Sequence, residues 1–169
     1  HGFLHLGIQL WRAWRFGLPG GDEPTLPEAV RVPPYYLDTP IARADIARHY
    51  DNIHQMDAAV GQVLARLEAD GLADSTVVIW TSDHGDGLPR AKRELLDSGI
   101  RVPMIIRWPA AWRPPGAVPG SADEQWISLV DLAPTLLELA DAAPPAGLHG
   151  RSFASQGSPP REYVYAARD

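Results

Sequence analysis

The sequence predicts an α/β sandwich, in which a mostly parallel central sheet is flanked by helices. Two observations carry this expectation. Amphipathic helical patterns over residues 39–70 and 127–140 enclose two apolar runs at residues 76–81 and 102–108. The first of these runs lacks polar alternation, which indicates a strand covered on both faces, as in a parallel or mixed central sheet.

The start of the chain is less regular than the rest. Apolar and polar residues alternate over residues 4–10, which predicts a half-buried strand. The aromatic and basic run at residues 11–16 is expected to pack at a surface, and His1 and His5 are interpreted as structural rather than site residues. Residues 17–40 are rich in Pro and Gly and predict a long irregular loop.

The long helix has recognisable ends. Asp38 or Thr39 can cap its first turn, Pro40 suits the first helical position, and Gly71 can close the last turn. At 1.5 Å per residue such a helix is about 45 Å long. Asp57 interrupts its apolar stripe, and we interpret it as a structural carboxylate with bonding partners rather than a site residue.

Irregular segments join the later elements. Residues 82–99 form a polar loop, and residues 109–124 are again rich in Pro and Gly. Pro134 is expected to break or kink the second helix. A last strand-like run begins near Tyr163.

The composition excludes several classes of function. The chain has 169 residues, of which 45% are apolar, enough for one domain or a large part of one. It has no cysteine, so disulfide and thiolate chemistry are excluded within it, while the compartment and the oligomeric state stay open. The net charge of −6 argues against a nucleic-acid partner. No run of about 18 apolar residues occurs, so no membrane span is expected.

A polar cluster follows the first apolar run. Asp83 and His84 stand where the strand should end, and ligands of open α/β sheets bind beyond the carboxyl ends of the strands. A carboxylate suits Ca²⁺ or Mg²⁺, whereas an imidazole suits Zn²⁺ or Mn²⁺ better. Asp86 is a third candidate ligand that we expect to fix the turn instead, and Gly85 and Gly87 let the backbone pass close to a ligand.

Three cations follow in the same loop. Arg90, Lys92 and Arg93 would lie near the metal end of the strand. A divalent cation and positive side chains stabilise the same spread negative charge, so the loop predicts a site for a metal and an oxyanion such as sulfate or phosphate. The alternative is a solvated charged loop with a helical turn at residues 91–96.

Several motifs in order carry a resemblance to a known family. They are Thr81-Ser82-Asp83-His84-Gly85, then Lys92, then Ser98-Gly99-Ile100-Arg101-Val102-Pro103, and finally residues 128–140 with Gly150-Arg151-Ser152 after them. This order resembles the second half of the type I sulfatase catalytic domain, in the alkaline phosphatase superfamily. Within it, the chain looks most like bacterial heparan N-sulfatase-like sulfatases.

The resemblance implies a fold and site roles. The fold would be an alkaline-phosphatase-like sandwich, present only in part. Asp83 and His84 stand where the family places two Ca²⁺ ligands, although many members have Asn at the second position. Lys92 stands where the family places a catalytic lysine that contacts the sulfate, and Arg90 and Arg93 would help bind the substrate. The substrate would be a sulfated small molecule or glycan, cleaved at a sulfate ester or sulfamate.

The chain departs from the family pattern in its first part. The family nucleophile is a formylglycine made from Cys or Ser in a C/S-x-P-S/A-R motif, and this sequence has neither a cysteine nor a Ser-x-Pro-x-Arg. Residues 1–31 match poorly and residues 32–169 match the second half. We therefore expect a partial catalytic domain, with the nucleophile half and the C-terminal subdomain missing and no activity alone.

Two alternatives stay open. A metal-dependent phosphodiesterase or phosphomutase of the same superfamily also carries Asp-His-Gly at this strand end, although Lys92 and the Gly-Ile-Arg-Val-Pro run favour a sulfatase. The other alternative is a non-catalytic remnant or binding module, which the absent nucleophile would support.

Overall fold

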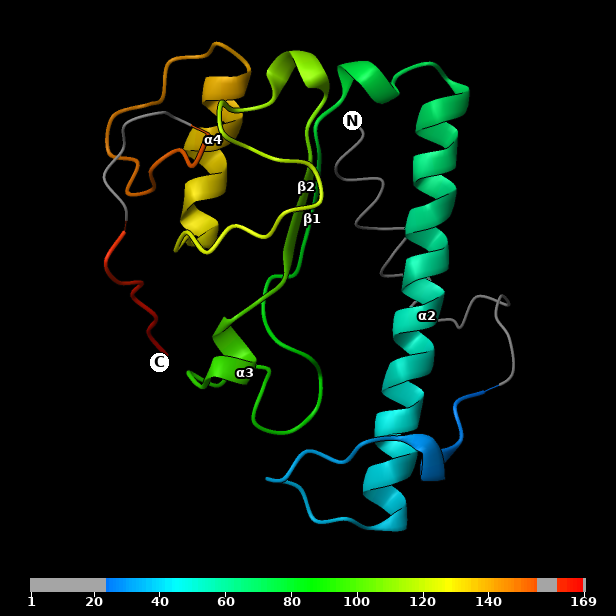
Figure 1. Ribbon diagram of the computed structural model, residues 1–169. Helices are drawn as coiled ribbons and strands as arrows, with labels where there is room; N and C mark the ends of the chain where they lie inside the picture. The colour runs from blue at the N-terminus through cyan, green and yellow to red at the C-terminus, as the bar shows by residue number, and fades with distance from the viewer. Residues whose placement is uncertain (1–23, 155–160, 169) are drawn as a thin grey trace. The chain divides into compact units, whose positions relative to one another are not determined.

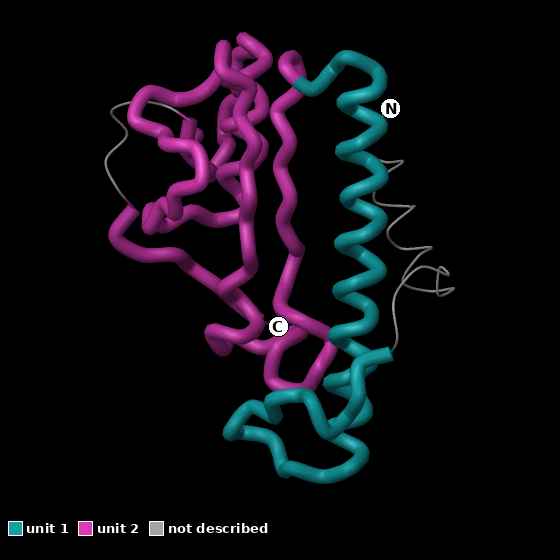
Figure 2. Tube along the Cα trace, turned by 45° about the vertical axis from the view of Figure 1, so that its right-hand side comes forward, with its two compact units in different colours: residues 1–73 teal, residues 74–169 magenta. Residues whose placement is uncertain are grey.

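The computed structural model describes residues 24–154 and 161–168 (Figure 1). The chain divides into two compact units, which Figure 2 distinguishes by colour at the boundary between Ala73 and Asp74. The expectations for residues 4–10 and 11–16, and for His1 and His5, lie outside the described residues.

Unit 1 is built on one long helix, α2 (Pro40–Ala69). The extended backbone of Thr39 places its hydroxyl where it accepts a hydrogen bond from the N–H of Ala42 at 3.1 Å. Gly71 adopts a φ of +69° just beyond the last turn, a conformation that glycine reaches without steric cost. Both ends of the predicted helix are therefore confirmed to within a residue.

The loop before α2 folds back on its first turns. It contains a short 3₁₀ turn, η1 (Pro27–Ala29), and buries Val30 together with Ile46 and Ala47 of the helix. Burying apolar groups of this size contributes only about 1–3 kcal/mol each, so this small core needs polar contacts as well.

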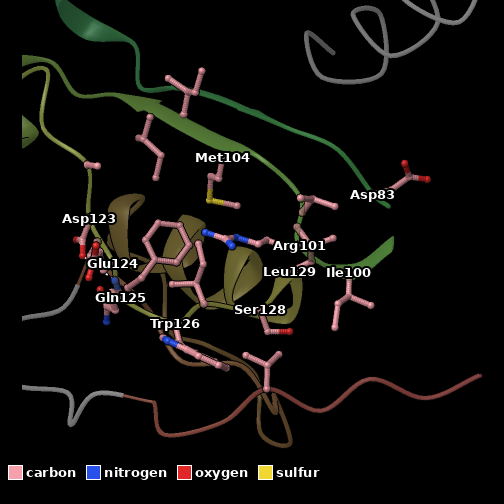
Figure 3. Close-up of a pocket in the computed structure, with 18 of the residues that line it drawn as sticks. Asp83, Ile100, Arg101, Met104, Asp123, Glu124, Gln125, Trp126, Ser128 and Leu129 are labelled. Atoms are coloured by element: carbon pink, nitrogen blue, oxygen red, sulfur yellow. Dashed lines mark hydrogen bonds between the residues drawn. The ribbon is translucent and has the colours of Figure 1, made fainter. Parts of the chain in front are cut away.

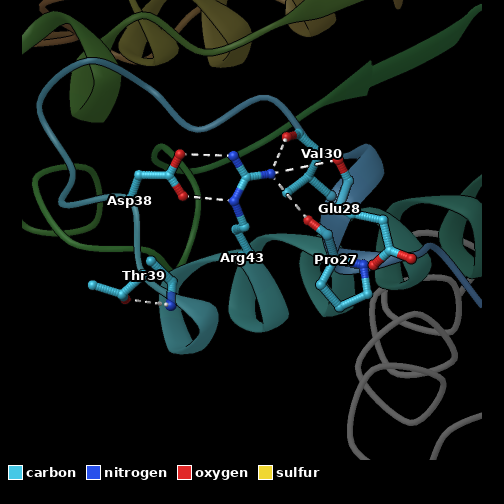
Figure 4. Close-up of polar contacts among 7 residues, drawn as sticks. Pro27, Glu28, Val30, Asp38, Thr39 and Arg43 are labelled. Carbon is cyan, nitrogen blue, oxygen red and sulfur yellow. Dashed lines mark hydrogen bonds and ion pairs between the residues drawn. The ribbon is translucent and has the colours of Figure 1, made fainter.

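Arg43 supplies those polar contacts (Figure 4). Its Nε and Nη2 donate to the two carboxylate oxygens of Asp38 at 2.6 and 2.7 Å. Its Nη1 faces three backbone carbonyl oxygens, those of Pro27, Glu28 and Val30, at 3.3–3.5 Å. The Arg43 guanidinium thus bonds both Asp38 and the segment Pro27–Val30 to the helix.

Unit 2 contains the strand pair β1 (Val78–Thr81) and β2 (Met104–Arg107). The two strands are antiparallel, with Val78 opposite Arg107 and Thr81 opposite Met104. Both lie inside the predicted runs at residues 76–81 and 102–108.

The direction of this pair differs from the mostly parallel sheet that the sequence predicted. A parallel connection needs a crossover, usually a helix of a dozen residues or more. The segment between β1 and β2 has only the single turn α3 (Asp97–Ile100), so it reverses the chain instead of crossing the sheet.

The second predicted helix begins as a 3₁₀ turn, η4 (Leu129–Asp131), and continues as α4 (Leu132–Leu139). Pro134 is the third residue of α4, where no N–H is needed for the helical ladder. Pro134 therefore fits the first turn and does not break the helix. A further 3₁₀ turn, η3 (Ala110–Trp112), follows β2, and η2 (Ala73–Ser75) precedes β1.

The buried carboxylate of Asp131 ties the loop after α4 to that helix. It accepts hydrogen bonds from the N–H groups of Ser128 and Arg151, each at 2.8 Å, and pairs with the guanidinium of Arg161. Gly150 lies against the carbonyl of Val130, where a Cβ atom would overlap with it. A buried charge is tolerated only with partners of this kind.

The strand-like run near Tyr163 is not a strand within residues 161–168. Extended backbone counts as a strand only when a neighbour completes its hydrogen-bond ladder, and no described segment does so here. Among the described residues, no helix is long and apolar enough to cross a membrane.

Candidate functional site

The two predicted metal ligands, Asp83 and His84, follow strand β1 at the surface of unit 2 and are here named the metal pair. Its last residue, Thr81, donates its hydroxyl to the carbonyl of Pro103 at 2.9 Å, and Ser82 donates to the carbonyl of His84 at 2.6 Å. The side chain of Asp83 is 84% exposed and that of His84 is 36% exposed. Asp83 and His84 are therefore adjacent and accessible at the strand end, as predicted.

The ring of His84 has a defined orientation. Its Nδ1 lies 2.7 Å from the carbonyl oxygen of Gly85, and its Nε2 lies 3.4 Å from Oδ2 of Asp83. A carbonyl only accepts hydrogen bonds, so Nδ1 carries a proton, which leaves Nε2 as the ring nitrogen that can bind a metal ion. Metal-binding histidines commonly donate their other nitrogen to a carbonyl in this way.

The two side chains alone could supply only part of the ligands of a metal ion. Asp83 supplies a hard oxygen that fits Ca²⁺, while the imidazole nitrogen of His84 fits it less well. In the part of the chain that the structure describes, no cluster of three His, Cys, Asp or Glu side chains could hold a metal ion.

The segment after the pair, residues 82–99, is here named the Lys92 loop. Its ends meet where the N–H of Gly85 donates to the carbonyl of Gly99 at 2.9 Å. A Cβ atom on Gly85 would overlap with the carbonyl of Ser98, and one on Gly99 would overlap with those of Ala91 and Glu94. Glycine is required at both positions because backbone approaches backbone there.

The centre of the Lys92 loop has an unusual backbone. Arg90 and Arg93 have φ values of +68° and +67°, a left-handed conformation that costs roughly 1–2 kcal/mol for a residue with a side chain. Between them Ala91 is 2% exposed and Lys92 points its N–H at the carbonyl of Asp86, 3.0 Å away. Strained backbone of this kind concentrates at functional sites.

Asp86 has the turn-fixing role that the sequence indicated. Its carboxylate accepts a hydrogen bond from the N–H of Leu88 at 2.9 Å. This is the bond that Asx turns use, so the side chain is engaged in the turn.

The predicted cations differ in their surroundings. Arg93 lines an open hollow of unit 2 together with Asp83 and His84, whereas Lys92 and Arg90 do not line it. Figure 3 shows Asp83 at one edge of this hollow, with Asp123, Glu124 and Trp126 on the opposite side. The side chains of Lys92 and Arg93 make no hydrogen bond or ion pair with the described residues.

The wall of the hollow beside the Lys92 loop comes from the end of the described chain. Arg168 pairs with Glu94 at 2.8 Å, which joins two segments separated by 74 residues. Val164 and Tyr165 then line the hollow alongside Glu94. Sequence reasoning missed this wall because no local pattern records so distant a contact.

One compositional signal for the site was also missed. The chain has 15 basic residues, and Lys92 is the single lysine among them. Arginine never gives up its proton in proteins, whereas a lysine amine can do so. The single lysine of the chain therefore lies between two arginines whose backbone is left-handed.

A model of one protein family, described as Sulfatase, matches residues 17–142. The chain belongs to the sulfatase family. It is 41% identical over 139 residues to an ulvan-active sulfatase of Formosa agariphila. This match covers 82% of this chain and 22% of that protein. It is 36% identical over 115 residues to the human N-sulphoglucosamine sulphohydrolase, covering 66% of this chain and 22% of the relative. This sulfatase-family chain thus spans about a fifth of the length of these relatives.

A solved structure agrees on the fold. The phosphonate monoester hydrolase SpPMH from Silicibacter pomeroyi superposes with a TM-score of 0.59 at 29% identity, over 71% of this chain and 24% of that one. The α/β, alkaline-phosphatase-like fold that the sequence predicted for this sulfatase-family chain is confirmed.

Proposed function

We propose that this chain forms part of a sulfatase that hydrolyses sulfate esters or sulfamates with the help of a divalent metal ion. Family membership supports the reaction. The observation that carries the proposal in this chain is the Lys92 loop, which begins at the metal pair and has a constrained backbone. The side chains of its Lys92 and Arg93 have no partner among the described residues.

Asp83 and His84 would hold the metal. Ca²⁺ is the ion that the family resemblance implies, and it would offset the negative charge of the sulfate group. Nε2 of His84 and Oδ2 of Asp83 lie 3.4 Å apart, so one cation could be bound between them. Further oxygen ligands would come from residues outside this pair, since Ca²⁺ takes 6–8 ligands.

Lys92 would act as the catalytic lysine. Its ammonium group can contact a sulfate oxygen and give a proton to the leaving oxygen or nitrogen. Arg93, which lines the hollow beside the metal pair, would bind the sulfate oxygens, and Arg90 would add positive charge.

We propose a sulfated carbohydrate as the substrate. The relatives named above include an ulvan-active sulfatase and an N-sulphoglucosamine sulphohydrolase, and both names indicate sulfated carbohydrates. The nucleophile, a formylglycine in this family, would lie on polypeptide outside the present sequence, which has no cysteine. On this view the 169 residues alone are inactive and contribute metal and sulfate contacts to a larger catalytic domain.

A second candidate function is supported by one structural comparison. The structural neighbour SpPMH is a phosphonate monoester hydrolase, so hydrolysis of a phosphonate or phosphate diester is the alternative chemistry. The non-catalytic remnant is the other alternative.

Turnover by the full-length protein separates these readings. We expect hydrolysis of 4-nitrophenyl sulfate and of sulfated oligosaccharides, loss of turnover with a chelator, and recovery with Ca²⁺. Phenyl phosphonate monoesters should be cleaved far more slowly. Faster cleavage of the phosphonate, supported by Zn²⁺ or Mn²⁺, would establish the phosphonate or phosphate diester hydrolase instead. A full-length protein that has no C/S-x-P-S/A-R motif and shows no turnover would be the non-catalytic remnant.

A further inference from the structure

Ser98 lies in the Lys92 loop but outside its hollow. Its Oγ donates a hydrogen bond to the carbonyl of Arg90 at 2.6 Å, eight residues earlier in the chain. Its neighbours Asp97 and Gly99 line the hollow, whereas Ser98 does not. Ser98 therefore contacts the backbone of the loop and is not placed to touch a substrate in the hollow.

The bond from Ser98 falls where the backbone is strained. Arg90 and Arg93 are both left-handed, and residues with side chains keep that conformation only when their surroundings impose it. Two backbone bonds hold the segment between and after them, from Lys92 N–H to the carbonyl of Asp86 and from Glu94 N–H to that of Ala91. The hydroxyl of Ser98 bonds the start of this segment, at the carbonyl of Arg90.

The backbone is also what aims the two cations. The side chains of Lys92 and Arg93 are exposed and make no hydrogen bond or ion pair with the described residues. Long cationic side chains without partners sample many rotamers, so their mean direction is set by the Cα–Cβ bond alone. A change in the backbone at Arg90 would redirect Lys92 in particular, because Lys92 is two residues further on.

From these contacts we propose that Ser98 is a positioning residue for Lys92 and Arg93. By holding the carbonyl of Arg90, it keeps the loop in the one conformation that presents both cations to the sulfate. This inference rests on the proposed function, since it assigns Ser98 a part in that reaction. It differs from a purely structural role, in which Ser98 would stabilise the fold without affecting where Lys92 points.

The test compares Ser98→Ala and Ser98→Thr in the full-length protein. Alanine removes the hydroxyl, and threonine restores a hydroxyl that can reach the same carbonyl. We expect kcat to fall roughly 10- to 100-fold in Ser98→Ala, the range that small misplacements of a reacting group produce. Ser98→Thr should recover most of it. The dissociation constant for Ca²⁺ should stay the same in both, because Asp83 and His84 are not held by Ser98.

Thr39→Ala serves as the matched control. It also removes one hydroxyl hydrogen bond, that to the N–H of Ala42, but in unit 1. We expect it to lower Tm with little change in kcat. If Ser98→Ala lowers Tm as Thr39→Ala does and leaves kcat unchanged, the role of Ser98 is structural and the proposal is overturned.

Two readouts do not depend on turnover. Competitive acylation measures the reactivity of the Lys92 amine, located by peptide mass in a region with no other lysine. Hydrogen exchange measures protection of the amides of Lys92 and Glu94. We expect altered amine reactivity and faster exchange in Ser98→Ala, restored in Ser98→Thr. Unchanged values in both measurements would overturn the role of Ser98, even if the wild-type protein cleaved no sulfate ester and the proposed function itself had failed.

Discussion

Basic side chains play different roles in two regions of this chain, the loop before α2 with Arg43 of that helix, and the Lys92 loop. In unit 1 the guanidinium of Arg43 is fully engaged, with Asp38 and three backbone carbonyls as partners. In unit 2 the Lys92 loop is closed by backbone contacts, and the side chains of Lys92 and Arg93 have no partner among the described residues. A cation that is fully bonded holds a fold together, whereas one left unpaired on a constrained backbone can bind an anion.

The largest fall in turnover is expected from a change at the metal pair. Asp83→Ala removes the carboxylate that would bind Ca²⁺, and since a metal supplies several kcal/mol of charge stabilisation, turnover should fall by about 10³-fold or more. Calorimetric titration with Ca²⁺ should show the same loss. Asp86→Asn is the matched control in the same loop, because its amide oxygen can still accept from Leu88 and both quantities should be retained. Equal losses in the two variants would remove the special role of Asp83.

Closure of the Lys92 loop should be the next most sensitive feature. Gly85→Ala places a Cβ atom on the carbonyl of Ser98, so we expect a loss of about 3 kcal/mol in the free energy of unfolding and a fall in turnover. Gly87→Ala, two residues away, meets nothing within 4 Å and should change stability by less than about 0.5 kcal/mol. Denaturant unfolding of both variants gives the comparison. An alanine at position 85 that is as stable as one at position 87 would show that the ends of the loop do not meet.

Arg43 should affect stability alone. Arg43→Met keeps the apolar stem but loses the contacts to Asp38 and the carbonyls, so the loop before α2 should exchange its amide hydrogens faster and Tm should fall. kcat should stay within about twofold, since no reacting group is involved. A large fall in kcat at unchanged Tm would contradict the distinction between the Arg43 contacts and the Lys92 loop.

The smallest effect is a pH dependence in unit 1. The hydrogen bond from Arg43 lowers the pKa of Asp38 below its ordinary value of 3.8. A carboxyl whose pKa is lowered by folding stabilises the fold above the ordinary value, and that stabilisation is lost as the pH falls through the lowered one. Wild type should therefore exceed Asp38→Asn in Tm at neutral pH, and the difference should shrink as the pH falls below 3.8 and vanish below the lowered pKa of Asp38. A difference that persists in acid would mean that the ion pair is not its source.

Local features were predictable from the sequence. Thr39, Pro40 and Gly71 fixed the ends of α2 because caps act within a few residues. Asp83 and His84 were predicted at the strand end because an apolar run stops at a polar cluster. The turn role of Asp86 followed from the same local reasoning.

Contacts between distant residues were not predictable. The antiparallel pairing of β1 and β2, the approach of Gly85 to Gly99 and the pairing of Arg168 with Glu94 each join segments whose separate patterns carry no record of the partner. The left-handed backbone at Arg90 and Arg93 was missed for a related reason, since only the surroundings impose it and arginine does not favour it.

The role of Lys92 is most directly tested with two substrates that differ in their leaving group. If the ammonium group protonates the leaving oxygen, Lys92→Ala should reduce kcat by about 10²-fold or more for a sugar sulfate, whose alkoxide leaves poorly. The reduction should be much smaller for 4-nitrophenyl sulfate, whose leaving group needs no proton. Lys92→Arg, which keeps the charge but cannot transfer a proton, should behave like Lys92→Ala on the sugar sulfate. Equal reductions for both substrates, or full activity of Lys92→Arg on the sugar sulfate, would contradict the account.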